Sequence, residues 1–566
     1  MSNQSEFKEY AWYKHYDAGV PRHIPYHGED LFTLLKQKVL EKSNVPALVF
    51  FGKETTYKEL FDKISRCMAS LHQLGIRKGD KVALLLPNCP QYVISYYAIL
   101  GVGATVVPVN PLSTETELAF LFKDAGVRLA IALDLLAGRL EKVRDTLRRE
   151  GLTGILEHTF YTSLREELPF PLNVLYPLKN KLSPEAKKRI QGARRFKELQ
   201  QSPVTGLPPA KWDVEQDLAV LLYTGGTTGK PKGVMLSQKN LVVNAFQCRS
   251  WIDFNEQDRL LAVLPIFHGF GMSVCMNATL VSGGTCILLP RFGAEDLLKA
   301  IQRYRPTIFA GVPTMYIGML NHKDFAKYDL SSLRGCFVGA APLPLEVKEQ
   351  FEKITGGRLL EGYGLTEAVT AICCNPFKGI NKAGSIGIPF ADTVIAVRDI
   401  ETGTRDLPPG EIGELVIQGP TLMLGYYNRP EETKEALRGG WLYTGDLGYM
   451  DEDGYFYIVD RKKDLIITGG FNVYPKEVED VLYRHPAVEE ACVIGVPDDY
   501  AGEKVKAFVK LKEGAGATAE DIIAFCREHL TPYKVPKEVE LVDDLPKSPI
   551  GKILRKELRQ RQRIPS

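Results

Sequence analysis

The sequence predicts an α/β fold, with a large N-terminal domain built from βαβ-type sheets and a smaller C-terminal α+β domain. Three observations predict it. Apolar strands alternate with helical segments through the first part of the chain, short glycine-rich strands follow over about 390–459, and a separate pattern begins after Asp460. The 566 residues exceed what one hydrophobic core normally serves, so several domains are expected.

The first βαβ unit spans an apolar strand at 81–86, a helix at about 91–100 and a second strand at 104–109. Parallel strands buried on both faces read as continuous apolar runs of this kind. The uncharged run 92–110 approaches the length of a membrane span, but Gly101, Gly103 and Pro108 interrupt it, so a buried helix and a strand are favoured. Further strands are expected at 218–222, 260–264, 286–289 and 307–312.

The second half of the chain changes character twice. Strands at 413–417 and 454–459 belong to a glycine-rich stretch typical of a small β-subdomain. After Asp460 the pattern restarts with a helix at 476–484, strands at 491–496 and 505–511, and a helix at 519–530. We therefore predict domains at 1–459 and 460–566, with the β-subdomain over about 390–459.

Composition excludes several classes of function. The 45% hydrophobic and 25% charged fractions are those of a globular protein, and 71 basic residues against 69 acidic ones give no general attraction to nucleic acid. Ten scattered cysteines fit neither a zinc site nor a disulfide framework, which indicates a reducing compartment. The N-terminus lacks the apolar core of a secretion signal, so a cytoplasmic protein is expected.

The segment 164–197 combines an apolar, proline-rich stretch at 169–178 with a cluster of lysines and arginines. Such a segment can contact an anionic membrane surface, here the inner face of the membrane. A solvated helix packed on the protein body explains the same residues, and the sequence leaves both interpretations open.

Residues 223–233, Tyr-Thr-Gly-Gly-Thr-Thr-Gly-Lys-Pro-Lys-Gly, have the composition of a phosphate-binding loop between an apolar strand and a helix that starts at Gln238. Glycines let backbone N–H groups approach phosphate oxygens, threonines add hydroxyls, and lysines add positive charge. The loop departs from the Walker pattern at Thr224 and Pro231. The alternative interpretation of this run is a flexible surface linker. The candidate ATP-contacting residues here are Thr224, Gly225, Gly226, Thr227, Thr228, Gly229, Lys230 and Lys232.

Two further clusters carry oxygen ligands and an aromatic ring. In the run 361–367, Tyr363 can stack on a base and Glu367 can hold Mg²⁺, and we place the run on a turn. Asp446 follows a glycine, and a carboxylate can accept both hydroxyl protons of a ribose. We place Asp446 after a glycine turn, and without further context an ordinary aspartate in a turn is the favoured explanation.

Charged residues mark two positions near the C-terminus. The run 460–464 is either a charged surface linker or a hinge that touches the nucleotide, and charge alone favours the linker. Lys552 lies on a loop constrained by Pro549 and Gly551, where it can neutralise negative charge that develops during a reaction. The alternative for Lys552 is a basic tail.

The five motifs occur in the order and approximate spacing of the adenylate-forming superfamily, which the chain resembles over nearly its whole length. That superfamily includes acyl-CoA synthetases, firefly-type luciferases and peptide-synthetase adenylation domains. Within it the chain is most similar to bacterial long-chain fatty-acid:CoA ligases, through 223–229, 267–271 and 460–464 leading into 469–475. Ile467 stands where several relatives carry a nucleotide-contacting lysine, so that contact is not expected here.

The resemblance implies that ATP activates a medium- to long-chain fatty acid as acyl-AMP, and that coenzyme A then takes the acyl group. It also implies that the C-terminal domain is mobile and turns about Asp460 between the two steps. The resemblance implies that Thr224 and Glu367 bind Mg²⁺ and that Lys552 neutralises charge. For the nucleotide it implies adenine contact by Gly339, Ala340, Ala341 and Tyr363, ribose contact by Asp446 and Arg461, and further ATP contacts by Glu361, Gly362, Gly364 and Thr366. Coenzyme A contact is implied for Gly469, Gly470 and Phe471.

The acyl group is assigned to two apolar, glycine-punctuated segments, 265–272 and 312–316. Ordinary core packing explains most of their residues equally well, and His268 is either a gate or a satisfied buried histidine. Neither segment contains an acidic residue, which disfavours amino-acid substrates. The candidate acyl-contacting residues are Phe267, His268, Gly269, Phe270, Val312, Pro313 and Thr314.

Other activities stay open as alternatives. They are a fatty acyl-AMP ligase that loads a carrier protein, a ligase for another hydrophobic acid such as an aromatic one, a luciferase-like oxidase and a non-catalytic nucleotide or lipid sensor. The presence of both Lys552 and Glu367 disfavours the sensor. The resemblance also leaves a homodimer open.

Overall fold

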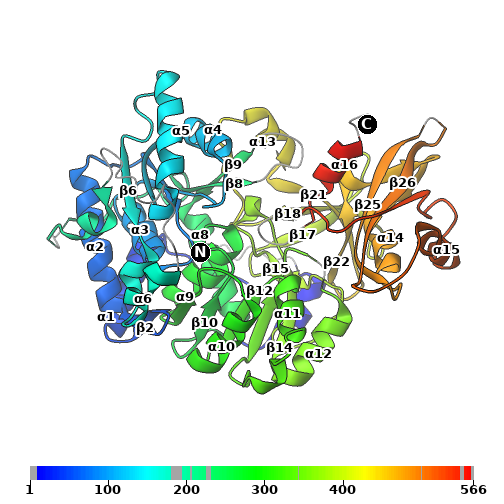
Figure 1. Ribbon diagram of the computed structural model, residues 1–566, viewed down its shortest axis with the longest axis horizontal. Helices are drawn as coiled ribbons and strands as arrows, with labels where there is room; N and C mark the ends of the chain where they lie inside the picture. Colours follow the sequence, from blue (N-terminus) through cyan, green and yellow to red (C-terminus); the bar gives the residue numbers. More distant parts are fainter. Residues whose placement is uncertain are drawn as a thin grey trace, which may run out of the picture. The chain divides into compact units, whose positions relative to one another are not determined.

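A computed structural model describes residues 9–179, 194–203, 207–224, 231–341, 343–498, 500–547 and 553–562. The chain divides into two compact units. The larger unit comprises Tyr13–Val394 and Gln418–Gly440, and the smaller unit comprises Met1–Trp12, Ile395–Ile417 and Trp441–Ser566. Figure 1 shows helices and sheets in both. The predicted boundary near Asp460 stays a prediction.

The larger unit contains a nine-stranded sheet whose central strands are parallel. Antiparallel strands close the sheet at both edges. In order across the sheet the strands are β16 (Ile388–Pro389), β15 (Cys373–Cys374), β14 (Arg358–Tyr363), β13 (Gly335–Val338), β12 (Ile308–Gly311), β10 (Arg259–Ala262), β11 (Thr285–Leu288), β1 (Pro46–Phe50) and β2 (Lys53–Thr56).

An eight-stranded sheet forms the other half of the larger unit. It is parallel from β8 to β7 and antiparallel where β9 pairs with β8 and β19. In order the strands are β19 (Gly425–Tyr426), β9 (Lys232–Ser237), β8 (Leu218–Thr224), β4 (Thr105–Pro108), β3 (Lys81–Leu85), β5 (Val127–Leu133), β6 (His158–Thr162) and β7 (Arg194–Arg195).

Helices connect the parallel strands and cover the sheets (Figure 1). Capping boxes at Thr56, Thr114 and Ser237 start three of them, because side chain and backbone satisfy each other's hydrogen bonds there. The helices are α1 (Leu31–Lys42), α2 (Tyr57–Gln73), α3 (Pro90–Gly101), α4 (Glu115–Ala125), α5 (Ala137–Arg149), α6 (Leu172–Lys179), α8 (Gln238–Trp251), α9 (Ala278–Val281), α10 (Ala294–Tyr304), α11 (Pro313–Leu320), α12 (Leu345–Thr355) and α13 (Pro430–Ala436).

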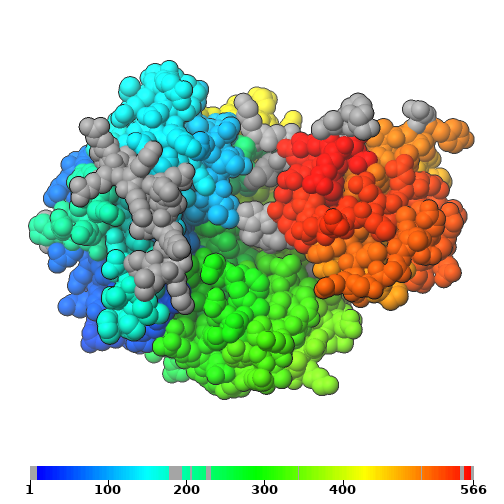
Figure 2. Space-filling view, in the orientation of Figure 1, coloured from blue at the N-terminus to red at the C-terminus, as the bar shows by residue number. Residues whose placement is uncertain are grey.

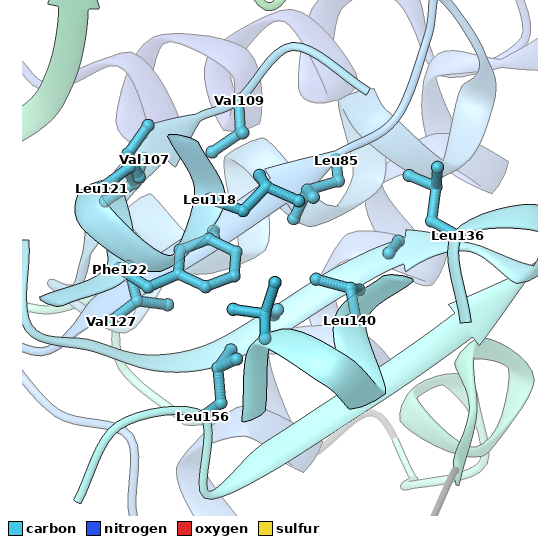
Figure 3. Packing of buried hydrophobic residues seen from close by; sticks show 14 of the residues in the cluster. Leu85, Val107, Val109, Leu118, Leu121, Phe122, Val127, Leu136, Leu140 and Leu156 are labelled. Carbon is cyan, nitrogen blue, oxygen red and sulfur yellow. The ribbon is translucent and has the colours of Figure 1, made fainter. Parts of the chain in front are cut away.

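One hydrophobic core of the larger unit lies where α4 and α5 pack on the eight-stranded sheet. Phe122 points from α4 towards Val127 and Val107, and Leu140 approaches from α5 (Figure 3). Each of these side chains is almost completely buried. Burial of a large apolar side chain contributes about 1.5–3 kcal/mol, so this cluster fixes both helices against the strands.

The smaller unit contains two sheets. In the first, β18 (Gly413–Gln418) and β22 (Phe456–Arg461) both pair antiparallel with β21 (Trp441–Met450), and β17 (Val394–Arg398) lies beside β18. The second consists of β23 (Ile466–Thr468), β24 (Phe471–Val473), β25 (Val488–Asp498), β26 (Gly502–Leu511) and β27 (Glu538–Leu541), with helices α14 (Pro475–Leu482), α15 (Ala519–His529) and α16 (Arg555–Gln562). Its orange-to-red residues form one packed body in Figure 2.

The predicted α/β class is confirmed, and the predicted strands and helices occur close to their expected bounds. The helix and strand predicted within 92–110 are α3 and β4. No helix in the described part of the chain combines the length and apolar character that a membrane span needs. Strand β9 differs from the expectation: Lys232 and Gly233, expected in a loop, begin this strand, which returns antiparallel along β8 before α8 starts.

Replacing Phe122 by alanine tests the core shown in Figure 3. The cavity left by the ring should cost about 3–5 kcal/mol, so the unfolding transition of the larger unit should move to lower urea concentration. The matched control is Leu112→Ala, just before α4, where the side chain is 75% exposed and the midpoint should stay near that of the parent. Equal midpoints for the two variants would contradict this account of the core.

Candidate functional site

The candidate site of the larger unit lies at the carboxyl ends of neighbouring parallel strands. Strands β14, β13, β12 and β10 are adjacent in that order and run parallel (Figure 1). The carboxyl edge of a parallel sheet is where such folds bind ligands. The predicted segments leave this edge: Glu361–Glu367 from β14, Gly339–Ala341 from β13, Val312–Thr314 from β12 and Phe267–Phe270 shortly after β10.

Segments from three of these strands touch one another. The backbone of Gly339 is so close to its neighbours that a Cβ there would lie 3.2 Å from Gly362 O and 3.4 Å from Phe270 Cε1. The structure therefore brings together the two segments predicted to flank adenine and the segment predicted to contact the acyl group. Pro342, which follows Ala341, lies outside the described residues.

The phosphate-loop candidates are divided between a strand pair and the residues that join it. Thr224 ends β8 and lies opposite Lys232 at the start of β9. Thr224 Oγ1 donates a hydrogen bond to Lys232 O at 3.5 Å. Gly225, Gly226, Thr227, Thr228, Gly229 and Lys230 lie outside the described residues.

Lys232, Tyr426 and Glu367 form a connected set. The Lys232 ammonium lies 4.9 Å from the centre of the Tyr426 ring, and Tyr426 OH donates to Glu367 Oε1 at 2.8 Å. Burial first, and then the neighbouring Glu367 carboxylate, raise the pKa of Tyr426, so its hydroxyl stays protonated and can keep donating. Strand β19 positions this tyrosine by pairing with β9.

Glu367 belongs to a loop that folds back tightly on β14. Thr366–Ala368 form a short 3-10 turn after β14, and Ile372 N then donates to Tyr363 O at 3.0 Å. A Cβ at Gly364 would lie only 1.0 Å from Thr370 O, so the fold requires glycine there. The predicted turn at 361–367 is thus the end of a strand followed by a loop.

A second close approach joins this loop to the acyl segment. A Cβ at Gly269 would lie 2.1 Å from Thr370 Oγ1 and 3.4 Å from Leu222 Cδ2 in β8. Any larger residue at position 269 would require Thr370 to move. Leu222 belongs to the eight-stranded sheet, so residues from both sheets meet at Gly269.

The two predicted acyl segments differ in exposure. Val312 and Pro313 are buried, Phe267 and Phe270 are partly buried, and Thr314 is exposed. His268 is partly buried, and Phe270 N donates to its Nδ1 at 3.3 Å. Burial lowers the pKa of His268 from 6.5 to about 4, so the ring is neutral near pH 7 and carries its proton on Nε2.

In the smaller unit, Asp446 and Arg461 lie opposite each other on β21 and β22. Arg461 Nε is 2.8 Å from Asp446 Oδ1, and the Asp446 side chain is 4% exposed against 35% for Arg461. The prediction that Asp446 follows a turn was wrong, because Tyr443–Asp446 lies within β21. The strand pairing, and not a turn, sets the carboxylate beside the guanidinium.

The run 460–464 is structured and partly buried, which excludes a fully solvated linker. Asp460 is 5% exposed, accepts hydrogen bonds from Arg461 N and Lys476 N, and has its pKa raised by burial. Asp464 is also buried and pairs with Arg559 Nη1 at 2.7 Å. The run therefore anchors to the body of the smaller unit.

Arg555 lies at the start of α16 and binds Glu479 with two hydrogen bonds, of 2.7 and 2.6 Å. Lys552 itself, with Ser548–Gly551, lies outside the described residues. On either side of that stretch, Lys547 and Ile553 form an isolated β-bridge, and Leu554 N donates to Pro546 O. Both ends of the stretch that holds Lys552 are thereby tied together.

The predicted coenzyme A residues form the connection between β23 and β24. Gly469 N donates to Ala501 O at 2.8 Å, and the Phe471 ring is 57% exposed and stacks on Tyr533 at 4.8 Å between centres. Ile467, at which no nucleotide contact was expected, is 52% exposed.

Sequence reasoning missed Tyr426 and Thr370. Tyr426 lies 59 residues after Glu367 in a segment without a recognisable motif, and only strand pairing brings it to the carboxylate. Thr370 lies three residues after Glu367, the end of the predicted motif, and its backbone conformation (φ 115°) is rare for a β-branched residue. A threonine in the sequence does not indicate such a backbone conformation, so Thr370 could not be predicted.

We predict that His268 makes stability depend on pH between 6.5 and 4. The native pKa is lower than that of an unfolded histidine, so the stabilisation is complete above about pH 6.5 and is lost as the pH falls towards 4. The loss at pH 4 should reach about 3 kcal/mol in the parent and be absent in His268→Gln. Thermal unfolding of both proteins across this pH range measures the difference.

The control for that measurement is His27→Gln, which replaces an exposed histidine of the same unit and should keep the pH profile of the parent. Superimposable profiles for the parent and His268→Gln would refute the assignment.

Comparison with known proteins identifies the family of the chain. The family model for AMP-binding enzymes matches residues 35–427, and the model for the AMP-binding enzyme C-terminal domain matches 477–552. A long-chain-fatty-acid–CoA ligase of Bacillus subtilis (strain 168) is 46% identical over 97% of each chain. One of Escherichia coli O6:H1 is 38% identical over 98% of each chain.

Among solved structures, an anthranilate CoA ligase, AuaEII, bound to anthranoyl-AMP superposes with a TM-score of 0.83. It is 30% identical in sequence and covers 95% of this chain and 98% of its own. The family model spans more than half of the sequence, and the Bacillus subtilis relative is 46% identical over almost the full length of both chains. The chain therefore belongs to the AMP-binding enzyme family.

Proposed function

We propose that this enzyme joins a medium- to long-chain fatty acid to AMP with ATP, and then transfers the acyl group to coenzyme A. The products are acyl-CoA, AMP and pyrophosphate. The observation that carries the proposal is the 46% identity with a long-chain-fatty-acid–CoA ligase over 97% of both chains. The meeting of the phosphate-loop strands, the Glu367 loop and the acyl segment at Gly269 supports it.

The first step makes a poor acylating agent reactive. A carboxylate oxygen attacks the α-phosphorus of ATP, a new P–O bond forms, and the bond from that phosphorus to pyrophosphate breaks. Negative charge accumulates, so cationic groups are required. We assign charge neutralisation to Lys552 and Lys232, and phosphate contacts to the 224–232 loop. We assign the adenine to Gly339–Ala341 and Tyr363, and the ribose to Asp446 with Arg461.

A magnesium ion fits the donors that the larger unit provides. Glu367 and Thr224 supply hard oxygen ligands, and Lys232 connects them, since it lies opposite Thr224 and over the Tyr426 ring that binds Glu367. No group of three or more His, Cys, Asp or Glu side chains suited to a metal occurs within the described ranges, and Mg²⁺ is normally held by one or two carboxylates plus substrate phosphates. When bound, Mg²⁺ would neutralise phosphate charge.

In the second step the sulfur of coenzyme A attacks the acyl carbonyl, the bond to AMP breaks and the thiol proton is released. We assign Gly469–Phe471 to the coenzyme A site and Asp460 to the hinge about which a mobile C-terminal domain at 460–566 turns between the steps. The bonds from Asp460 to the backbone of Arg461 and Lys476 would define where the chain bends.

Replacing Lys552 by alanine should separate the two half-reactions. We expect ATP–pyrophosphate exchange to fall at least a hundredfold, because the developing charge loses its counter-ion. Thioester formation from supplied acyl-AMP and coenzyme A should stay within about threefold of the parent, since no pyrophosphate leaves in that step. Both rates are measured on the same preparation.

The control is Lys547→Ala, which removes a lysine just before the Lys552 stretch; its partners in the structure are Glu490 at 2.7 Å and Asp544 at 3.6 Å. It should keep both activities. Equal loss of the two half-reactions in Lys552→Ala would contradict the division of roles. A parent that forms acyl-AMP but transfers it only to a carrier protein would instead identify a fatty acyl-AMP ligase, and a preference for aromatic acids would exclude the fatty-acid assignment.

We further propose peripheral contact with the inner face of an anionic membrane through α6 and the residues just before it. Phe170, Leu172, Val174 and Leu175 are 82%, 40%, 54% and 44% exposed, which is unusual for neighbouring large apolar side chains. The basic residues of 179–197 follow directly in the sequence, so apolar insertion and attraction to anionic lipid would act together.

The homodimer that the family resemblance leaves open is tested by sedimentation equilibrium.

The membrane contact predicts that Phe170→Glu combined with Leu175→Glu weakens binding to phosphatidylglycerol-containing vesicles by at least tenfold, since each buried apolar side chain contributes about 1.5–3 kcal/mol. Vesicle co-sedimentation measures it. Leu345→Glu is the control, because Leu345 is an exposed leucine too, at 52%, but belongs to a different helix, α12. Binding that is unaffected in the double variant, or equally weakened in the control, would exclude α6 as the contact.

A further inference from the structure

A π-helix begins at the end of the acyl segment 265–272. It spans Gly271–Asn277, and all seven residues are buried. π-helices are rare and occur frequently at functional sites. Ser273 within it is 0% exposed, so its hydroxyl needs a partner inside the protein.

That partner is Asn244 on α8, which is also 0% exposed. Ser273 Oγ donates to Asn244 Oδ1 at 2.5 Å, and Asn244 Nδ2 donates to Ala371 O at 2.6 Å. The Ala371 carbonyl can only accept, which fixes the orientation of the amide. Asn244 thus uses its oxygen for the π-helix and its nitrogen for the loop that follows Glu367, and the same nitrogen also donates to Gln247 Oε1 at 3.2 Å.

Ala371 is the fixed end of a strained stretch. Val369 and Thr370 have φ values of 63° and 115°, which β-branched residues rarely adopt. Such conformations persist only where the surroundings hold them. Here Gly364 packs on the Thr370 carbonyl, Gly269 packs on the Thr370 hydroxyl, and Asn244 holds the next carbonyl.

We propose that Asn244 is a positioning residue that couples the acyl site to the loop carrying Glu367. Filling the acyl site presses on the π-helix, and the Ser273–Asn244–Ala371 chain passes this constraint to the strained loop. The proposal rests on the proposed function, since it assigns the acyl group and ATP to these segments. Because coupling between sites is reciprocal, a fatty acid must tighten ATP binding by the factor by which ATP tightens fatty-acid binding.

The test measures this coupling factor without turnover. Calorimetry gives the Kd of α,β-methylene-ATP with Mg²⁺, alone and with saturating dodecanoate, for the parent and its variants. We expect about tenfold tighter binding with dodecanoate in the parent, within the usual range of coupling. The factor should fall below about twofold in Asn244→Ala and Ser273→Ala. Asn244→Asp, which keeps the acceptor for Ser273 but loses the amide donor to Ala371, should behave in the same way.

Ser282→Ala is the matched control, because Ser282 is another buried serine of the larger unit and its hydroxyl donates to Ala278 O. It should keep the coupling factor of the parent. Ser273→Ala keeps the test decisive if Asn244→Ala does not fold.

The failures of the two proposals are distinguishable. A parent that binds neither dodecanoate nor the ATP analogue overturns the proposed function. A parent that binds both, but whose coupling factor is absent or is unchanged in the Asn244 and Ser273 variants, overturns the positioning role alone.

Discussion

The contact between Gly269 and Thr370 is the constraint on which the site of the larger unit depends. It allows the acyl segment after β10, the loop after β14 and Leu222 of β8 to meet without an intervening side chain. The first two belong to one sheet and Leu222 to the other. Parallel strands bring their carboxyl ends to one edge, but only close backbone approach allows two such edges to share a site.

Charged side chains have different kinds of partner in the two units. In the larger unit the Lys232 ammonium, the Tyr426 ring and the Glu367 carboxylate form a connected chain. In the smaller unit Arg555 and Arg559 bind the buried carboxylates of Glu479 and Asp464. Removing one partner of such a buried pair leaves a charge without compensation, so these pairs hold α16 to the remainder of the smaller unit.

Much of the fold and part of the site could be predicted from the sequence. The buried parallel strands were predicted because both faces require apolar residues, and the family could be recognised because five motifs occur in a fixed order. Strand β9 was missed, since Lys232 and Gly233 look like part of a glycine-rich loop, and Asp446 was placed at a turn because glycine precedes it. In both cases hydrogen bonding to a neighbouring strand outweighed local composition.

The sequence by itself determined the α/β class, the alternation of strands and helices, the family and the identity of the candidate residues. Periodicity, glycine placement and motif order are local properties, so they can be recognised without coordinates. The tertiary structure alone decided that Tyr426 binds Glu367, that Gly269 packs on Thr370, and that Asn244 joins the π-helix to Ala371. These contacts join residues 59, 101 and up to 127 positions apart, and long-range pairing depends on how whole sheets and helices pack.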